Sequence, residues 1–516
     1  MSGIMAILLL LQHGAWASIP PMPDARQEVG AIAVEGRVYV IGGLDSNGAA
    51  STRVDIFDTH TGTWQPAPAF PIPVHHSMVA AAGHKIYVAG GYTDPGFLPH
   101  ARTYEFDPDL SIWTRKADMP TVRGAGAAAS YGGKVYVFGG ERTGESVNEV
   151  AAYDPIANSW TTVAPMPTPR NHLGAALAHG KIYVVGGRPG NLSVNEAFDV
   201  AAGSWTTQSP LPTGRSGIAA AAIGKYVYVF GGEGNAGSPS GTFSENEAYD
   251  ADADIWTAVE AMPMPRHGIG AGVAGNRIYI PAGGPVAGFG TTAQSDFFEA
   301  AQDIVLPQFV VGGGYRTEIF LSNPASRSAD INMSITDMNG SPLATTIDGV
   351  QRSAVSVTVA PLGSRTFSAP DTSGTLRAGT VRIRSNVRVN VFAVVRLTGS
   401  PAVTVYPASP ARSAMVQVRL NRNSQTNTGL AVANTGPASA SVVLTLLNDS
   451  GNEVARIDRS LAPGGQLSRF VDELFANLQQ SDFQGTITVR SSQAVSVVAL
   501  AFDRDGILTI PVVPIE

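Results

Sequence analysis

The chain of 516 residues contains no cysteine. Disulfide bonds, zinc–thiolate sites and thiol nucleophiles are therefore excluded. Charge is also sparse: charged residues form 15% of the chain, the net charge is −7, and lysine and arginine do not cluster in runs. Because a nucleic-acid-binding surface needs a basic patch or stripe, DNA and RNA are excluded as main partners.

Long apolar runs are missing as well, and we expect no membrane span. The N-terminal sequence MSGIMAILLLLQ is apolar over residues 4–11 only, which is too short to cross a bilayer but matches the core of a signal peptide. Ala15-Trp16-Ala17 supplies a small-x-small cleavage pattern, although no Lys or Arg precedes the apolar run and cleavage would remove Trp16. We expect an exported protein, secreted or held in the cell envelope, with residues 1–13 as a signal peptide or, alternatively, an N-terminal extension.

Glycine and proline, in contrast, are abundant, with 57 and 35 residues. This balance favours a turn-rich all-β architecture. The length is too great for a single core and predicts two to four domains.

Tryptophan marks an internal repeat in the first half of the chain. The six tryptophans follow one another at spacings of 45 to 51 residues, which indicates a repeat architecture. They are Trp16, Trp64, Trp113, Trp160, Trp205 and Trp256. Each full copy also carries a Gly-Gly pair, the last at Gly283-Gly284, and in five copies the aromatic residue of an aromatic-Asp pair lies seven residues before a tryptophan, as in Phe198-Asp199.

This combination of motifs resembles the Kelch repeat over residues 14–302. The resemblance implies a six-bladed β-propeller with one four-stranded antiparallel blade per repeat. In one complete copy the strands are expected at about 170–178, 181–186, 194–199 and 204–207. The last unit lacks an outer-strand tryptophan and the segment around Trp16 lacks inner strands, so we expect the N-terminal strand to close the sixth blade and remove an exposed sheet edge.

Small residues dominate the first strand of each copy, as in GAGAAAS at 124–130, which fits strands that converge on a narrow axis. Arginine opens this strand in five copies, at Arg26, Arg123, Arg170, Arg215 and Arg266. One interpretation is a basic ring that binds an anion at the axis. The favoured interpretation is structural, with each guanidinium bonding carbonyl groups of the adjoining turn.

Length varies almost entirely in the loop between the second and third strands. Length change that is tolerated on one face of a repeat array is typical of its binding face. Residues that break the repetition on this face are the predicted ligand-binding candidates. They are Glu28, Asp45, His76, Tyr92, Glu141, Arg142, His172, Arg188, Glu233 and His267.

We predict no cofactor and no metal site. His75 and His76 are adjacent, so alternation along a strand would point them to opposite faces, and no carboxylate at metal-ligand spacing accompanies them. Asp250, Asp252 and Asp254 resemble part of a calcium loop, but the glycine and the closing glutamate are missing.

The second half of the chain shows a different self-similarity. IFLSNPASRSADINMSITDMNGSPL at 319–343 returns as GLAVANTGPASASVVLTLLNDSGNEV at 429–454. Alternating strands with short turns predict two antiparallel β-sandwiches, at 303–410 and 411–516. They resemble the immunoglobulin-like modules of bacterial surface and secreted proteins, which implies a spacer or anchor role.

The predicted function is a non-catalytic binding module for a glycan or an extracellular protein on the loop face, in a monomeric protein. Kelch-type enzymes supply the alternative. Galactose oxidase chemistry is excluded because its copper site requires a Tyr-Cys cross-link. By resemblance to sialic acid mutarotase, Glu141 or Glu233 would act as general acid/base while Arg142 or Arg188 holds a carboxylate, although the family's Glu-Arg pair is not reproduced in either loop.

Overall fold

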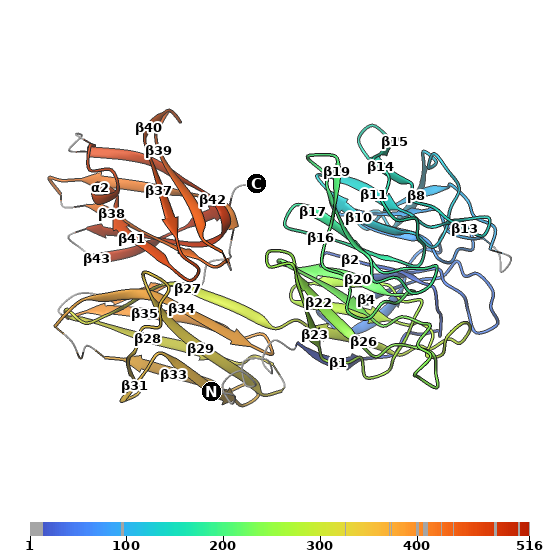
Figure 1. The fold of residues 1–516 in the computed structure, drawn as a ribbon, viewed down its shortest axis with the longest axis horizontal. Coiled ribbons are helices and arrows are strands. Elements are labelled where there is room, and N and C mark those ends of the chain that lie inside the picture. The colour runs from blue at the N-terminus through green and yellow to red at the C-terminus, as the bar shows by residue number, and fades with distance from the viewer. Residues whose placement is uncertain are drawn as a thin grey trace. The chain divides into compact units, whose positions relative to one another are not determined.

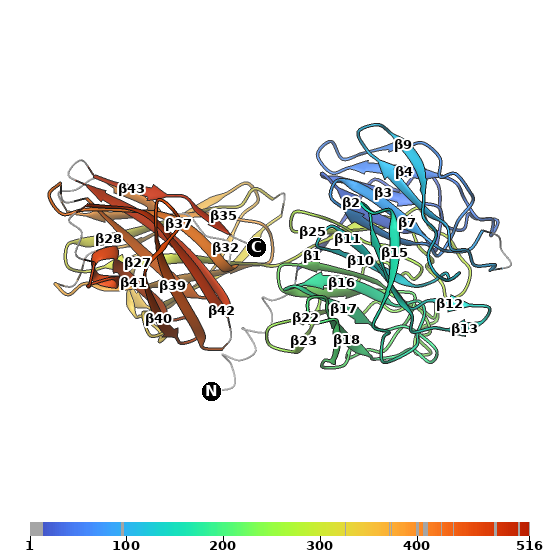
Figure 2. The same cartoon turned by 90° about the horizontal axis from the view of Figure 1, so that it is seen from above.

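The structure is a computed structural model that describes residues 14–516 except 94–96, 326, 371, 373, 399–401, 406–410, 425, 437, 479–481, 504–505 and 515–516. The expected signal peptide at residues 1–13 and the boundary between the two expected sandwiches, near residue 410, lie outside the described residues. The chain divides into one unit from His13 to Ala300 and a second from Ala301 onward, both built almost entirely of strands (Figures 1 and 2). Among the described residues, no helix has the length and apolar character needed to cross a membrane.

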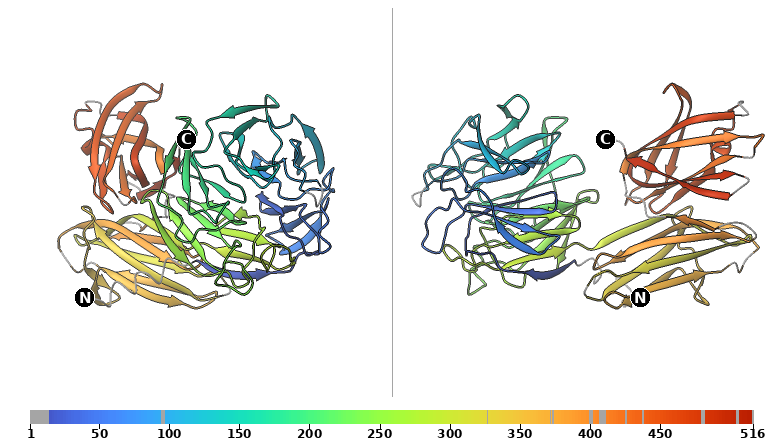
Figure 3. Two further views of the ribbon diagram at one scale, coloured as in Figure 1. Left: turned by 45° about the vertical axis from the view of Figure 1, so that its right-hand side comes forward. Right: turned by 180° about the vertical axis from the view of Figure 1, so that it is seen from behind.

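Six four-stranded antiparallel sheets form the propeller-like first unit (Figure 3). Sheets one to three consist of β2 (Gly30–Val34), β3 (Arg37–Ile41), β4 (Val54–Asp58) and β5 (Thr63–Pro66); β6 (Met78–Ala82), β7 (Lys85–Ala89), β8 (Thr103–Asp107) and β9 (Ile112–Lys116); and β10 (Ala127–Tyr131), β11 (Lys134–Phe138), β14 (Val150–Asp154) and β15 (Ser159–Val163). Sheets four and five consist of β16 (Gly174–Ala178), β17 (Lys181–Val185), β18 (Asn195–Asp199) and β19 (Ser204–Thr207); and β20 (Ala219–Ile223), β21 (Tyr226–Phe230), β22 (Asn246–Asp250) and β23 (Ile255–Val259). A small hairpin, β12 (Glu141–Arg142) and β13 (Glu145–Ser146), extends from the third sheet's loop.

The sixth sheet joins the two ends of this unit. It contains β24 (Gly272–Ala274), β25 (Arg277–Pro281), β26 (Ser295–Glu299) and, as its outer strand, β1 (Ala15–Ile19). β1 pairs with β26 so that Trp16 stands opposite Phe298, and the two rings pack edge to face with centroids 5.4 Å apart. The predicted pairing of the N-terminal strand with the last repeat is therefore present, and β26 is not left as an open edge.

Each indole links its sheet to the preceding one. The Nε1–H group of every tryptophan donates a hydrogen bond of 2.7 to 3.0 Å to a backbone carbonyl in the segment that follows the previous tryptophan. Trp64 bonds to the carbonyl of Pro20 in this way, and Trp16 bonds to that of Glu260, which completes the circle. The tryptophans therefore hold neighbouring sheets together, as expected.

The glycine pairs form a second circle of contacts. The N–H group of the second glycine donates to the carbonyl of a residue that lies four to six positions before the next sheet's first strand, over 2.8 to 3.0 Å in all six cases. These glycines have φ between 99° and 118°, which only glycine adopts readily. In the last copy this glycine is Gly283, and Ala282 at φ 60° takes the place of the first glycine. The residues that correspond to the glycine pair in this copy are therefore Ala282-Gly283, one position before the expected pair Gly283-Gly284. The sequence motif did not reveal this because alanine replaces the first glycine.

The five repeated arginines are completely buried and structural. Their guanidinium groups donate to backbone carbonyls, as Arg170 does to Val184 at 2.9 Å, and each is paired with a carboxylate of the same sheet. The second sheet has neither member of this pair: Val74 replaces the arginine, and Tyr104 takes the position that Glu196 holds beside Arg170. Val74 and Tyr104 belong to one apolar cluster. The arginine and the carboxylate at these two positions are therefore replaced together in the second sheet, and neither charge is left without its partner.

The second unit contains the duplicated half of the chain. Its first part has two sheets, β27 (Gln302–Val311), β34 (Arg377–Ser385), β29 (Ala329–Asp337) and β32 (Ala354–Val359), and β33 (Ser364–Ala369), β28 (Tyr315–Ser322), β35 (Asn390–Leu397) and β36 (Ala402–Val405), with a hairpin of β30 (Thr345–Ile347) and β31 (Val350–Arg352). Its second part has β40 (Glu453–Leu461), β39 (Ala440–Asn448), β42 (Asp482–Asp503), β37 (Ala411–Asn421) and β44 (Val512–Pro514), with β38 (Asn427–Asn434), β41 (Gln466–Phe470) and β43 (Gly506–Ile510) attached. The helical turn α2 (Val471–Leu474) follows β41.

Two asparagines show the duplication at atomic detail. The Asn323 amide donates to the carbonyls of Arg327, Val359 and Ala360, and the Asn434 amide donates in the same way to those of Ala438, Leu461 and Ala462. Asn323 directly follows β28, and Asn434 is the last residue of β38, at corresponding places in the repeated sequence segments. One buried side chain thus fixes the same corner in each copy, in agreement with the predicted repeat.

The second sheet suggests a test of the buried ion pairs. Glu196→Ala should lower the free energy of unfolding by about 3 kcal/mol, because it leaves the buried Arg170 charge without a partner. Arg170→Val combined with Glu196→Tyr reproduces the Val74–Tyr104 arrangement and should cost less than the single change. Denaturant unfolding followed by tryptophan fluorescence measures this, since all six tryptophans lie in the first unit. A double variant that is less stable than Glu196→Ala would contradict the interpretation.

Candidate functional site

A ring of six residues surrounds the axis of the first unit, each twelve positions after a tryptophan. The members of this axial ring are Glu28, His76, Ala125, His172, Gly217 and Gly268. The backbone N–H of each member donates to the carbonyl of the preceding member, over 2.7 to 3.1 Å, and Glu28 closes the circle by donating to Gly268. The ring fixes the positions of its side chains at the point where six sheets meet.

All six members have a left-handed backbone, with φ between 52° and 68°. Two are glycines, but Glu28, His76, Ala125 and His172 carry side chains, and this conformation costs about 1–2 kcal/mol for each such residue. Non-glycine residues in this region often occur at functional sites. The presence of one Glu and two His side chains at such positions makes the axial ring a candidate functional site.

The ring lies at one end of an axial cavity of about 350 Å³. The first strands of the six sheets line this cavity, mostly with alanine and glycine, as the sequence predicted. At its ring end the lining changes to Glu28, His76 and His172. The polar groups of the axis are thus concentrated on the face that carries the loops between second and third strands.

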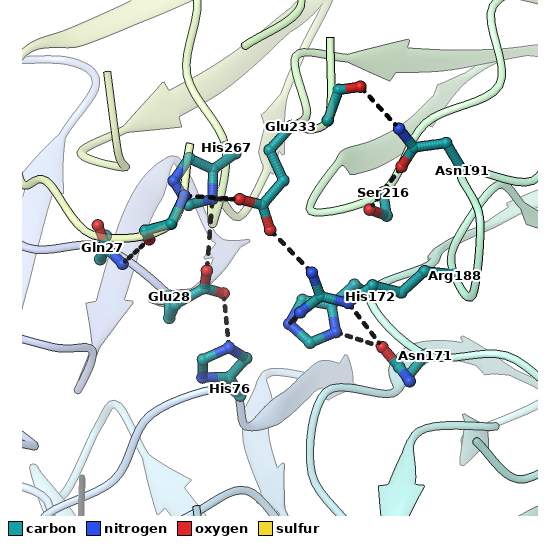
Figure 4. A network of polar contacts seen from close by, with 12 residues as sticks. Gln27, Glu28, His76, Asn171, His172, Arg188, Asn191, Ser216, Glu233 and His267 are labelled. Atoms are coloured by element: carbon teal, nitrogen blue, oxygen red, sulfur yellow. Dashed lines mark hydrogen bonds and ion pairs between the residues drawn. The ribbon is translucent and has the colours of Figure 1, made fainter. Parts of the chain in front are cut away.

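Six predicted site residues form one polar cluster on this face (Figure 4). They are Glu28, His76, His172, Arg188, Glu233 and His267. His76 Nε2 lies 3.1 Å from Glu28 Oε2, Arg188 Nη1 donates to Glu233 Oε1 at 3.0 Å, and Arg188 Nη2 donates to His172 Nε2 at 2.6 Å. These residues come from five of the six sheets, so the cluster depends on the complete circle.

His267 lies between two carboxylates. Its Nε2–H donates to the carbonyl of Val286 at 2.9 Å, and its Nδ1 is 3.5 Å from both Glu28 Oε1 and Glu233 Oε2. Burial lowers the His267 pKa, but Glu28 and Glu233 outweigh this effect and raise it above its ordinary value. The geometry therefore favours an imidazolium that bridges the two acids.

The other two histidines of the cluster are neutral. Burial holds the pKa of His76 at about 4 and that of His172 well below its usual value. Burial would raise the pKa of Glu28, but its contacts with the surrounding histidines, among them the protonated His267, lower it overall, so Glu28 is ionised. The polar cluster thus contains two negative charges, on Glu28 and Glu233, and two positive charges, on Arg188 and His267.

The expectation that His75 and His76 point to opposite faces is wrong. Their Nδ1 atoms are 2.6 Å apart, and their ring centroids are separated by 4.8 Å. Strand β6 begins only at Met78, and His76 has φ 52°, so strand alternation does not apply. The argument that no carboxylate accompanies the histidines also fails, because Glu28 reaches them from another sheet.

The remaining predicted residues have separate places. Tyr92 is buried beside the cluster, with its ring centroid 5.4 Å from that of His76. Glu141 lies at the edge and accepts a 3.4 Å bond from the Asn171 amide. Arg142 pairs with Glu149 instead of the cluster, and Asp45 accepts backbone N–H groups within its own turn.

Gln27 is a site residue that sequence reasoning missed. Its side chain bonds to the backbone of Gly288 and Gly290, while Glu233 Oε2 accepts the N–H of Gly288 at 2.9 Å. These contacts tie the loop of the sixth sheet to the cluster. Gln27 occupies the same position after its tryptophan as His267, which is the signal that could have identified it.

Apolar side chains are exposed around this cluster. Phe97 and Leu98 in the second sheet's loop are 47% and 62% exposed, and Val286 and Phe289 in the sixth sheet's loop are 43% and 51% exposed. The Phe97 ring lies 5.5 Å from that of His76, and the backbone carbonyl of Val286 accepts the hydrogen bond from His267. We call this surface, the cluster with these four side chains, the loop face.

Comparison with known proteins identifies Kelch repeats in this unit. The model of the KLHDC2/KLHL20/DRC7 Kelch-repeats domain matches residues 28–232 and 75–284. Beta-scruin of Limulus polyphemus is 31% identical over 143 residues, which are 27% of this chain and 16% of the relative. Kelch-like protein terF of Aspergillus terreus is 31% identical over 288 residues, 53% of each chain. The chain thus spans about half or less of the length of these curated relatives.

Among solved structures, that of YjhT aligns with 54% of this chain and with 96% of its own length. The TM-score of this alignment is 0.45 and its sequence identity is 16%.

His100, which lies on this face, should make the stability of the folded protein depend on pH. It lies in the second sheet's loop, where its Nδ1 accepts the N–H of Arg102, and burial lowers its pKa to about 4. Since the unfolded state takes up this proton near pH 6.5 and the folded state does not, stability should fall as the pH drops from 6.5 toward 4. By pH 4 the loss from His100 amounts to about 3 kcal/mol.

The variant His100→Gln isolates this contribution. Its denaturant unfolding, followed by tryptophan fluorescence between pH 7 and pH 4, should depend less steeply on pH than that of the unsubstituted chain. Equal slopes in the two proteins would refute the assignment to His100.

Proposed function

We propose that this Kelch-repeat protein binds a protein ligand on the loop face of a six-bladed propeller whose sixth blade is completed by β1. The observation that carries the proposal is the placement of four exposed apolar side chains, Phe97, Leu98, Val286 and Phe289, around a charge-balanced polar cluster. Protein interfaces use aromatic and apolar anchors of this kind near their centre. Loop length also varies on this face, as is typical of binding faces of repeat proteins.

The opposite face of the same unit provides a contrast. Its most exposed apolar side chains, Leu110 and Ile156, lie on tight turns between the third and fourth strands of two different sheets. Single exposed apolar residues of this kind are normal for protein surfaces. The combination of apolar anchors and a fixed polar centre is what favours the loop face as the binding surface.

Two matched variants test the proposal. Phe97→Ser with Phe289→Ser should abolish retention of protein ligands by the immobilised full chain from an extract of the source cells, because it removes one anchor from each loop. Leu110→Ser with Ile156→Ser alters the same number of exposed apolar residues on the opposite face and should retain them. Equal ligand sets, identified by mass spectrometry, for the unsubstituted chain and the first variant would refute the loop face as the binding site.

A carbohydrate ligand is a second candidate because Arg188 and Glu233 meet on this face. In a mutarotase-type mechanism Glu233 would serve as general acid/base and Arg188 would hold the sugar carboxylate. Arg142 is less suited to this role, since it pairs with Glu149. Glycan-array binding that is lost in Glu233→Ala, together with accelerated anomer exchange in an NMR assay, would favour this candidate over a protein ligand.

We propose further that the protein is exported and that its second unit serves as a spacer of two immunoglobulin-like modules. The apolar residues 4–11 and the duplicated sandwich pattern support this role. Fractionation of the source cells tests it: recovery from the cytosol alone would contradict export.

A further inference from the structure

We propose that the axial ring binds one divalent transition-metal ion through Glu28, His76 and His172. One ligand atom from each of these residues lies within 4.8 Å of the others. His76 Nε2 and Glu28 Oε2 are already 3.1 Å apart, close to the separation of two ligands that each lie about 2.0–2.1 Å from one tetrahedral ion. This site goes beyond the proposed ligand-binding function and was not expected from the sequence.

The ring supplies the rigidity that a metal site requires. The three residues occupy equivalent positions in three different sheets, and the closed circle of backbone hydrogen bonds fixes their Cα atoms. Gly268, the ring member next to Glu28, leaves space for the carboxylate. A Cβ atom on Gly268 would lie 2.5 Å from Glu28 Oε1, so only glycine at this position allows the carboxylate its present place.

Neighbouring residues orient both imidazole rings. His172 Nδ1–H donates to Asn171 Oδ1 at 2.5 Å, and His76 Nδ1 is bonded to His75 Nδ1 at 2.6 Å. Outer contacts of this kind fix the orientation and tautomer of metal-bound histidines and leave the other nitrogen as the ligand. In both residues Nε2 is therefore the atom directed at the proposed ion.

Arg188 competes with the ion for His172. Its Nη2 donates to His172 Nε2, the atom that would bind the metal, and it adds a positive charge beside the site. The Arg188 side chain is 39% exposed and also pairs with Glu233, so it can withdraw from His172 while it keeps its acidic partner. At His172, binding thus exchanges one hydrogen bond for one metal–nitrogen bond, and at His76 and Glu28 the ion replaces their direct contact.

The donor set selects the class of metal. Two imidazole nitrogens and one carboxylate suit zinc and the later first-row metals, whereas calcium and magnesium prefer oxygen ligands. A set of three protein ligands leaves a further position for water. We use Zn²⁺ as the probe, and Co²⁺ as its spectroscopic substitute.

Isothermal titration of the metal-free, untagged full chain with Zn²⁺ tests the proposal. We expect one equivalent to bind, and His172→Gln and Glu28→Gln should each weaken binding by about tenfold or more. Arg188→Gln should bind Zn²⁺ more tightly than the unsubstituted chain, because it removes the competing donor and its charge. His84→Gln, which alters an exposed histidine away from the ring, should have no effect.

Co²⁺ absorption distinguishes the site from loose surface binding. Intense visible bands of a low-coordinate ion should appear with the unsubstituted chain and with His84→Gln, but not with His172→Gln. Circular dichroism of the metal-free variants establishes that each is folded, and Glu28→Gln provides a second test if His172→Gln is not. The proposal is overturned if neither the unsubstituted chain nor Arg188→Gln binds one equivalent, or if Glu28→Gln and His172→Gln bind as tightly as the unsubstituted chain.

Discussion

The first unit depends on circles of hydrogen bonds that run from one sheet to the next and return to their start. Backbone groups of the axial ring form the innermost circle, the glycine N–H groups form another, and the six indoles form the outermost. Each bond contributes about 1 kcal/mol net, and a missing sheet would leave partners unsatisfied on both sides. The backbone conformation in each circle also limits which residue types can occupy a position. Ala282, with φ 60°, can replace only the first glycine of a pair, because the second glycines have φ of 99° to 118°. Residues that recur in every repeat thus reflect the requirements of the backbone geometry. Residues that depart from the repeat are the candidates for a functional site.

Much of this could be predicted from local spacing. The tryptophan period located the repeats, and the incomplete first and last copies predicted the pairing of β1 with β26. The composition of the axial cluster could not be derived in this way. Glu28 and His172 are 144 positions apart and meet only because the circle closes; their equal distance from Trp16 and Trp160 was the available clue. The conclusion that His76 lacked a carboxylate partner failed because it considered one strand at a time.

Charged side chains serve two purposes in this unit, and the sequence repeat distinguishes them. Arg170 and its counterparts recur in five sheets and bond to the carbonyls of their own sheet, so they stabilise the fold. Arg188 occurs once and bonds across sheets to His172 and Glu233. The recurring charges can be exchanged for apolar residues, as Val74 and Tyr104 show, whereas the single charges create a site.

The axial cluster and the apolar rim of the loop face are connected through His267 and Glu233. His267 faces Glu28 with one nitrogen and bonds to Val286 with the other, and Glu233 accepts the N–H of Gly288. A cation on Glu28 would weaken the attraction of that carboxylate for the His267 imidazolium. Since His267 also holds the loop that presents Val286 and Phe289, occupancy of the axial ring would bias the same surface that we propose binds a protein ligand.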